Sequence, residues 1–254
     1  MIGNILASDT SLSTLERLYI RLFGVPINGL RIRARRILPY LVPKYHRILD
    51  AGCGQGVFTF EAARRLPASL VTGMDANSGL IERNRRIADA AGLSNCRFEC
   101  GDIAAIPADS RYDLILSIDV LEHIEDDIGV LTGYYRALEP QGELLLHVPG
   151  YYRRWPLFSW RVNFEVEGHC RPGYTMDDIT GKVEGAGFAV IERYHTYGWL
   201  ETMTNNISYA ITGAKMKRKG LYTLVFPILL FISYFGRNSR PERGAGVFIH
   251  ARKQ

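Results

Sequence analysis

Residues 48–56 read Ile48-Leu49-Asp50-Ala51-Gly52-Cys53-Gly54-Gln55-Gly56, and this stretch decides the fold. Its first two residues are apolar and suit a buried strand, and an acidic residue stands at the end of that strand. Three glycines then make a turn without side chains, and Val57 to Leu66 has the pattern of a helix. A strand, a glycine turn and a helix N-terminus let backbone N–H groups approach a bound ligand closely. The stretch therefore predicts an α/β protein with a cofactor at this turn.

Two kinds of cofactor are bound at such turns, and the spacing distinguishes them. The dinucleotide fingerprint Gly-x-Gly-x-x-Gly requires a glycine where this chain has Val57. Asp50 would also repel a pyrophosphate, whereas it suits a cofactor with a positively charged end. The string Leu49 to Gly56 resembles the first motif of the class I S-adenosylmethionine (SAM) methyltransferases. This resemblance extends over residues 45–195 and implies that SAM is the cofactor.

Expected strands and helices alternate along the body of the chain. The strands are expected at 47–51, 69–75, 96–101, 112–118 and 143–148, and the helices at 57–66, 78–91 and 125–138. A turn is expected at 138–142, and residues 188–194 and 247–251 are expected to form a closing hairpin. This pattern predicts a Rossmann-like, doubly wound α/β fold with a mostly parallel, seven-stranded sheet. An N-terminal helical cap and a hydrophobic helical insertion before the last strand complete the expected architecture.

The chain divides into four segments on this interpretation. They are a basic helical cap (1–45), the SAM-binding core (46–195), a hydrophobic insertion with basic flanks (196–243) and the final core strand (244–254). Helices are expected in the cap at 12–23 and 28–41. Within the core, residues 150–173 are expected to form a long loop or lid, and Thr175 opens the next helix. The aromatic residues of the lid could line an apolar pocket or cover the sheet edge; they are Tyr151, Tyr152, Trp155, Phe158 and Trp160.

Acidic residues stand at the ends of the second and third expected strands, where open α/β sheets bind ligands. By resemblance to the family, Asp75 accepts hydrogen bonds from both ribose hydroxyls. Asp102 accepts from the adenine amino group, and Ile103 lies against the ring. Either acid alone could instead cap a helix or solvate a loop, and Asp113, at the opposite end of the sheet, is interpreted as structural. The full set of expected cofactor-binding residues is Asp50, Gly52, Cys53, Gly54, Gly56, Asp75, Ala76, Asp102, Ile103, Ser117 and Ile118.

Methyl transfer from SAM requires the protein to align the acceptor and, when the acceptor is a hydroxyl, to remove its proton. His123 and His169 are the candidate catalytic residues, because imidazole titrates near neutral pH. His123 could equally cap a helix or pack in a loop, and His169 could be a lid residue paired with a carboxylate. Glu122 and Asp119 could hold a metal beside a catechol. No carboxylate cluster completes that site in the sequence, so no metal is expected.

The net charge of +5 is distributed unevenly along the chain. Residues 12–47 carry +7 and residues 214–254 carry +8, whereas residues 48–213 carry −9. Basic flanks of this kind can be solvated surface, or they can contact anionic lipid or nucleic acid. The four cysteines fit no zinc-binding spacing and the N-terminus shows no secretory signal, so a reduced, cytoplasmic protein is expected.

The insertion contains an uncharged, strongly apolar run from Gly220 to Gly236. As a helix it would reach about 26 Å, short of the ~30 Å core of a bilayer, and Pro227 would kink it. If strands 188–194 and 247–251 pair, both ends of the insertion lie on one side of a membrane, which forbids a single crossing. Basic flanks favour a helix lying in the membrane interface. The alternative is a buried helix at a dimer interface or beneath the N-terminal helices.

The sequence thus predicts a SAM-dependent methyltransferase, peripherally associated with an anionic membrane surface, with oxygen favoured as the acceptor atom. Its acceptor would be lipid-soluble or membrane-tethered, such as a quinone-like, glycolipid or polyprenyl-linked molecule. One alternative is a methyltransferase for a soluble small molecule with the insertion at a homodimer interface. Another is a SAM-binding protein without transfer activity. Nucleic acid is not expected as a partner, because Ser117-Ile118-Asp119-Val120 replaces the Asn-Pro-Pro-Tyr type of motif after the fourth strand.

Overall fold

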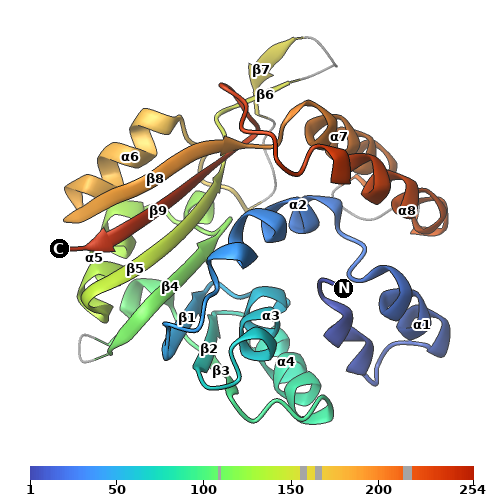
Figure 1. Ribbon diagram of the computed structural model, residues 1–254, viewed down its shortest axis with the longest axis horizontal. Helices are drawn as coiled ribbons and strands as arrows, with labels where there is room; N and C mark the ends of the chain where they lie inside the picture. Colours follow the sequence, from blue (N-terminus) through green and yellow to red (C-terminus); the bar gives the residue numbers. More distant parts are fainter. Residues whose placement is uncertain (108–109, 155–158, 164–167, 214–218) are drawn as a thin grey trace.

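Seven strands form one central sheet in the computed structural model, which describes residues 1–107, 110–154, 159–163, 168–213 and 219–254. The strands are β1 (Arg47–Ala51), β2 (Leu70–Asp75), β3 (Cys96–Cys100), β4 (Tyr112–Ile118), β5 (Leu138–Pro149), β8 (Phe188–Thr196) and β9 (Gly246–Lys253). Their order is β3-β2-β1-β4-β5-β9-β8, with β1 to β5 parallel and β9 antiparallel to both neighbours (Figure 1). The predicted fold class and the closing hairpin are confirmed.

Helices cover both faces of the sheet. The core helices are α3 (Val57–Arg65), α4 (Ser78–Ala90), α5 (Asp127–Ala137) and α6 (Met176–Gly185), with 3-10 turns η3 (Ile103–Ala105) and η4 (Leu121–His123). Residues of α3 and α4 pack on one face and residues of α5 and α6 on the other. Thr175 accepts the Asp178 N–H and caps α6, as predicted. Asp113 accepts the backbone N–H groups of His46 and Arg47, which confirms its structural role.

Two segments of the core depart from the prediction. The expected turn at 138–142 is a bulge inside a longer strand, because β5 already pairs with β4 at Leu138 and pairs again at Glu143. Gln141 within this bulge has a φ of 66°. The expected loop at 150–173 contains a short hairpin of β6 (Tyr152–Arg154) and β7 (Trp160–Val162). The predicted pocket residues Trp155 and Phe158 lie outside the described residues.

The N-terminal cap consists of η1 (Asn4–Ser8), α1 (Thr14–Phe23), α2 (Asn28–Ile37) and η2 (Leu38–Tyr40). The helix expected at 28–41 gives way to a 3-10 turn after Ile37, because Pro39 has no N–H with which to continue the helical ladder. An ion pair attaches the cap to the core, with Asp9 Oδ2 2.7 Å from Arg83 Nε of α4. The cap therefore packs on the sheet-covering helices.

The insertion folds into two helices, α7 (Trp199–Thr212) and α8 (Lys219–Phe235), which pack on each other and on α2. Figure 1 shows α1, α2, α7 and α8 grouped on the side of the molecule away from α6. Tyr222, Phe226 and Leu229 on the inner side of α8 are buried in a small apolar cluster. Among the residues that the structure describes, no helix is long and apolar enough to span a bilayer.

The arginines of α2 are buried or half-buried, whereas Arg21 and Lys44 of the cap are exposed, so the expected contact with anionic lipid stays a prediction. Arg36 Nη2 lies 2.7 Å from Oε2 of Glu201, which is 0% exposed. Arg35 Nη1 donates to the Ser233 carbonyl at 2.8 Å, and Arg31 Nη1 donates to two backbone carbonyls of the cap. A charge count along the chain does not show which way each side chain points. Arg35 and Arg36 therefore bind the cap to the insertion, whereas Arg31 binds backbone groups within the cap.

Candidate active site

The glycine turn between β1 and α3 is packed on one side and open on the other. Gly52, Gly54 and Gly56 have φ values of 75°, 50° and 72°, a left-handed conformation that favours glycine. A Cβ atom on Gly52 would lie 2.6 Å from a Val120 methyl carbon, and one on Gly56 would lie 3.0 Å from the Phe98 ring. A Cβ atom on Gly54 would meet no described atom within 4 Å. The backbone at Gly54 is therefore accessible to a ligand.

Asp75, at the end of β2, is tied to this turn. Its Oδ2 accepts the Gly54 N–H at 2.8 Å, and its Oδ1 accepts the Asn77 N–H at 2.9 Å. A carboxylate can accept about four hydrogen bonds, so both oxygens retain capacity for ligand hydroxyls. Asp102, at the end of β3, accepts the Ala104 N–H at 2.9 Å and caps η3. Its side chain therefore has the capping role that the sequence left open, and its contact with adenine stays a prediction.

Asp50 is buried beneath the glycine turn. Its Oδ2 accepts a hydrogen bond from Thr59 Oγ1 at 2.6 Å. Burial raises the pKa of Asp50 to about 6, and the negative charge of Asp75 acts in the same direction. A positive charge on a bound ligand would stabilise the ionised carboxylate. The turn is thus suited to a cationic ligand, as the sequence indicated.

The remaining predicted cofactor residues offer mainly backbone groups. Ser117 Oγ lies 3.3 Å from a buried tyrosine hydroxyl of α5, so its side chain faces the core. Cys53, Ile103 and Ile118 are buried, and burial raises the pKa of the Cys53 thiol. Ala76 is exposed just beyond β2. Contact between these residues and a cofactor stays a prediction.

A central cavity of about 460 Å³ lies between the ends of β4 and β5 and the helices α2, α7 and α8. It is lined by Arg33 of α2, His147 of β5, Asn205 and Tyr209 of α7, and Tyr222 of α8. These groups come from segments that are far apart in the sequence. The cavity extends from the cofactor end of the sheet to the inserted helices, and it is large enough for a small organic molecule.

Two residues that the sequence analysis missed form an ion-pair network at this cavity. Arg33 Nη1 lies 2.8 Å from Asp119 Oδ2 and donates to the Tyr197 hydroxyl at 3.0 Å. His147 Nδ1 lies 2.6 Å from Asp119 Oδ1, and His147 Nε2 lies 2.9 Å from Thr196 Oγ1. Burial alone would raise the pKa of Asp119, but the charges of Arg33 and His147 lower it. A histidine inside the apolar run of β5 was the only signal in the sequence for this network.

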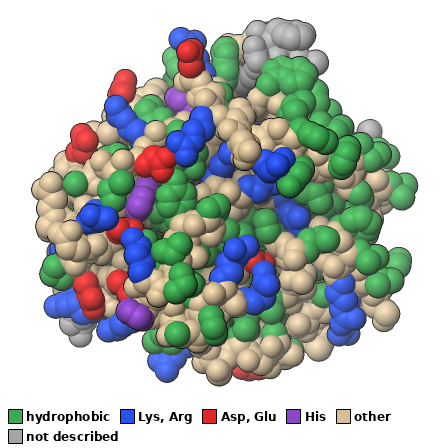
Figure 2. Space-filling model, in the orientation of Figure 1, with side chains coloured by type: hydrophobic (Ala, Val, Ile, Leu, Met, Phe, Trp, Pro, Cys, Tyr) green, Lys and Arg blue, Asp and Glu red, His purple; other side chains and the backbone are tan. Residues whose placement is uncertain are grey.

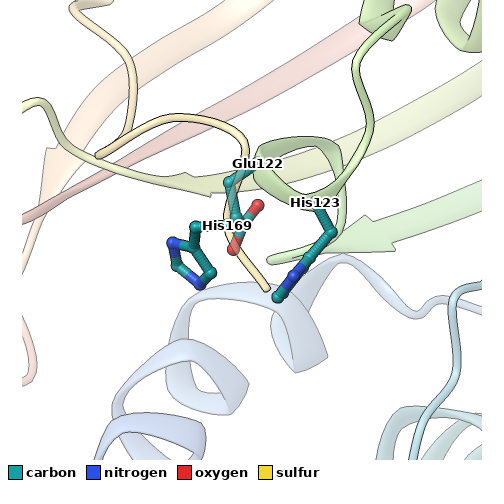
Figure 3. Close-up of side chains that lie close together, drawn as sticks. All are labelled: Glu122, His123 and His169. Carbon is teal, nitrogen blue, oxygen red and sulfur yellow. The ribbon is translucent and has the colours of Figure 1, made fainter. Parts of the chain in front are cut away.

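The two predicted catalytic histidines lie together at the floor of the cavity (Figure 3). The ring centroids of His123 and His169 are 4.5 Å apart, and His123 Nδ1 lies 2.8 Å from the Gly168 carbonyl oxygen. Burial, and then the neighbouring His123, lower the pKa of His169. Burial, and then the charge of Asp119, raise the pKa of Glu122 well above its usual range. The fold therefore assembles a compact polar group from two separated segments.

The predicted aromatic pocket is a separate feature. Tyr151, Tyr152 and Trp160 line a second cavity of about 380 Å³, together with Tyr174 and His195. The aromatic residues of the lid that the structure describes therefore lie apart from the central cavity and beside the edge of the sheet. This arrangement corresponds to the edge-covering role that the sequence also allowed.

Comparisons with known proteins agree with this geometry. Residues 44–167 match a family model described as a methyltransferase domain. The chain is 34% identical over 116 residues to a trans-aconitate 2-methyltransferase of Deinococcus radiodurans, covering 45% of this chain and 43% of that protein. It is 29% identical over 114 residues to a ubiquinone biosynthesis O-methyltransferase of Coxiella burnetii, covering 44% and 47% respectively. The chain spans about half the length of the curated relatives that it matches.

A solved structure shares the fold over the whole chain. It is an O-methyltransferase from a trans-AT PKS multienzyme of Brevibacillus brevis in complex with S-adenosyl-L-homocysteine. The TM-score is 0.59 at 13% sequence identity, covering 100% of this chain and 80% of that one. Residues 44–167 therefore form a methyltransferase domain, and the fold is that of the class I SAM-dependent methyltransferases, whose cofactor is SAM.

The residues at the glycine turn fit SAM. Asp75 has the free acceptor capacity that ribose hydroxyls require, the Gly54 side of the turn is open, and the buried Asp50 carboxylate suits a cation. When bound, SAM supplies an electrophilic methyl group on a positively charged sulfur. The residues at the strand ends would hold this cofactor, and the chain would have to align an acceptor beside it.

Proposed function

We propose that this protein uses SAM to methylate an oxygen atom of an acceptor that has an apolar body and resides at a membrane surface. Quinone-like molecules and glycolipid or polyprenyl-linked molecules have this character. The observation that carries the proposal is a pair of exposed apolar stripes on α1 and α8, beside the central cavity. Three further features support it: the extent of the cavity, the polar groups at its floor and the similarity to the Coxiella burnetii O-methyltransferase.

The apolar stripes are the outward faces of two neighbouring helices. On α8 the stripe consists of Leu221, Leu224, Ile228, Phe231 and Phe235, and on α1 it consists of Leu15, Leu18 and Leu22. These positions recur at the three- and four-residue spacing of one helix face. The Tyr19 hydroxyl donates to the Thr223 carbonyl at 2.7 Å and joins the two helices. Figure 2 shows hydrophobic side chains gathered along the right-hand edge of the molecule, where these helices lie.

Exposure of these stripes has a physical cost in water. The inner face of α8 already packs on the protein through Tyr222, Phe226 and Leu229, so the helix is apolar on two opposite sides. Large contiguous apolar patches on a folded protein mark sites of contact with lipid or protein. A helix that is too short to cross a bilayer can instead lie in the membrane interface, with its apolar face toward the lipid. This supports lipid contact along α1 and α8.

The central cavity extends from the strand ends to the inner face of α8, the helix that carries one of the two stripes on its outer face. Its lining includes His123 and His169 at the strand ends and Tyr222 on the inner face of α8. An acceptor whose polar head lies at the histidines could therefore extend its apolar part toward the striped helices. Entry from the membrane side would then keep that part out of water throughout.

The polar groups at the cavity floor suit a hydroxyl acceptor. An imidazole nitrogen can accept the proton that a hydroxyl releases as its oxygen takes the methyl group. His123 and His169 both line the cavity, and their ring centroids are 4.5 Å apart. The likeness to the ubiquinone biosynthesis O-methyltransferase of Coxiella burnetii also supports an oxygen atom on a lipid-soluble molecule as the acceptor.

A labelling experiment tests the acceptor class. Purified protein is incubated with SAM that carries a deuterated methyl group, together with either a membrane lipid extract or a water-soluble metabolite pool. The proposal predicts label in a lipid product, detected by mass spectrometry, at an O-methyl group. Label that appears only in the water-soluble pool overturns the acceptor class, and absence of any product in both pools favours a SAM-binding protein without transfer activity.

Variants of the histidines test the role of the cavity floor. His123→Gln and His169→Gln should each lower turnover far more than they change SAM affinity, because they act on the acceptor and not on the cofactor. His195→Gln is the matched control, since His195 is a partly buried histidine on β8 that lies outside the central cavity. Wild-type turnover in both cavity variants would contradict their assignment.

A soluble acceptor is the second candidate, and the polar lining of the cavity favours it. Arg33, Arg153 and Asn205 could bind a small anionic molecule, and the Deinococcus radiodurans relative is a trans-aconitate 2-methyltransferase. The apolar stripes would then be buried between two copies of the chain. Sedimentation of the purified protein separates the two cases, because this candidate requires a dimer together with label in the water-soluble pool.

A further inference from the structure

One carboxylate and two imidazoles converge at the floor of the central cavity (Figure 3). Candidate ligand atoms of Glu122, His123 and His169 all lie within 4.8 Å of one another. The Cys170 N–H donates to the Glu122 carbonyl at 2.8 Å, which holds the segment carrying His169 against η4. The three side chains therefore come from two segments that the backbone fixes side by side.

The polar atoms of this group are incompletely used within the protein. Glu122 is 1% exposed, and its Oε2 has no hydrogen-bond partner among the residues that the structure describes. The same holds for His169 Nδ1. A buried carboxylate oxygen without a partner is costly unless a ligand provides one. The unpartnered, buried carboxylate therefore indicates a ligand-binding role for this group, in addition to the close spacing of the three side chains.

His123 is oriented as metal-binding histidines are. Its Nδ1 lies 2.8 Å from the Gly168 carbonyl oxygen. A hydrogen bond from this nitrogen to the carbonyl places the ring proton on Nδ1 and leaves the lone pair of Nε2 free. Histidines that bind metals commonly donate their second ring N–H to a backbone carbonyl, which fixes the ring and its tautomer.

We infer that Glu122, His123 and His169 bind a divalent transition-metal ion in the central cavity. Two nitrogen ligands and one carboxylate suit Zn²⁺, Mn²⁺ or Fe²⁺ better than Mg²⁺ or Ca²⁺, which prefer oxygen ligands. Three protein ligands leave a coordination position open. A metal ion in this site would bind the acceptor oxygen and lower the pKa of its hydroxyl, so that the proton would pass to solvent and the two histidines would act as ligands in place of bases. This last step rests on the proposed function, whereas the metal site rests on the three side chains alone.

No metal was expected from the sequence, because no carboxylate cluster completes a site around Glu122 and Asp119. Asp119 does not complete such a cluster, since its two oxygens are engaged by Arg33 and His147. The ligand that the sequence analysis did not connect with this group is His169, which lies 47 residues after Glu122 in the chain.

Metal titration of the full chain, without a histidine tag, tests the inference. After chelator treatment and dialysis, Co²⁺ is added while its visible absorption is followed, and Zn²⁺ and Mg²⁺ are titrated by calorimetry. We expect one equivalent of Co²⁺ and of Zn²⁺ to bind, with Mg²⁺ at least tenfold weaker. Binding of less than one equivalent of Co²⁺ and Zn²⁺, or Mg²⁺ binding as tight as Zn²⁺, overturns the inference.

Variants locate the bound ion. Glu122→Gln and His169→Gln should each weaken Zn²⁺ binding by more than tenfold, and His195→Gln should not change it. SAM affinity, measured on the same samples, shows that each variant is folded. Equal Zn²⁺ affinity in wild type and both cavity variants overturns the assignment. A protein that methylates a lipid but binds no metal refutes this inference alone, and one that binds metal but methylates no lipid refutes the proposed acceptor alone.

Discussion

Replacing Leu224, Ile228 and Phe231 of the α8 stripe by serine tests membrane contact directly. These residues are 76%, 59% and 65% exposed, so the change removes little internal packing. Transfer of a Leu, Ile or Phe side chain from water into an apolar environment contributes roughly 1.5–3 kcal/mol. With about two-thirds of each side chain available, the three together contribute on the order of 3–6 kcal/mol. The variant should therefore bind membranes ~10²–10⁴-fold more weakly.

Liposome flotation measures this difference. Wild type should float with zwitterionic vesicles, and anionic lipid should strengthen binding by a salt-sensitive amount. The salt-sensitive part should be modest, because Arg31, Arg35 and Arg36 are engaged inside the protein. The hydrophobic part should persist in high salt. A wild-type protein that stays in solution with anionic vesicles at low salt would refute membrane contact and favour a dimer interface.

A matched variant controls for general loss of surface hydrophobicity. Val42, Ile128 and Ile191 are 38%, 52% and 47% exposed and lie before β1, on α5 and on β8, away from the stripes. Their replacement by serine should leave flotation unchanged, and SAM affinity should match wild type in both triple variants. If the stripe variant floats as well as this control, the reasoning from the apolar stripe fails.

Deletion of 221–235 is a poorer test than substitution, although the sequence alone would suggest it. Tyr222, Phe226 and Leu229 fill the space between α8 and the neighbouring helices, and Ser233 accepts hydrogen bonds from Arg35. Removal of the whole helix would uncover an apolar surface and remove the two Ser233 acceptors of the half-buried Arg35 guanidinium. The deletion would therefore perturb the cap as well as remove the apolar stripe.

Three further predictions concern the cofactor and the stability of the cap. Asp75→Ala should weaken SAM binding in calorimetry, because each lost charge-assisted hydrogen bond costs on the order of 1.5–3 kcal/mol; equal affinities would contradict the assignment. Burial raises the pKa of Asp50 from 3.8 to about 6, so this group stabilises the unliganded fold fully below the unfolded pKa, and the contribution is lost as the pH rises through 6. A cationic cofactor favours the ionised form, so SAM affinity should rise up to ~10-fold from pH 5 to 7, and Asp50→Asn should flatten that rise. Glu201→Ala should lower the free energy of unfolding in urea by roughly 3–5 kcal/mol, because Arg36 is left buried and unpaired; a loss under 1 kcal/mol would contradict this.

The glycine turn and the strand-end acids of the expected cofactor half could be located from the sequence, because their signals are local. Strand, glycine turn and helix lie within residues 47–66, and the acids that end β2 and β3 follow directly from the strand pattern. Backbone constraints at Gly52 and Gly56 then specify the residue type, since a side chain would collide with the core. Such features depend on neighbours in the chain, which a sequence displays.

The residues around the central cavity could be predicted only in part, because tertiary structure brings them together from distant parts of the sequence. His123 and His169 could be named as candidates, but their contact depends on a backbone hydrogen bond between two distant segments. Arg33 could not be found at all. It reaches Asp119 because α2 crosses the ends of β4 and β5, and nothing near Arg33 in the sequence encodes that crossing.

The arginines of α2 show how one helix joins the inserted helices to the central cavity. Arg33 pairs with Asp119 at the cavity, and Arg36, less than one helical turn further on, pairs with Glu201 of the insertion. The Arg36–Glu201 pair is buried and the Arg33–Asp119 pair is half-buried, so α2 cannot shift relative to either partner without unpairing a charge that is partly or wholly removed from water. The two ion pairs therefore fix the position of the cavity floor relative to the inserted helices. Any movement of α8 at a membrane would act on the cavity through α2, so lipid binding and acceptor binding should be linked through these two ion pairs.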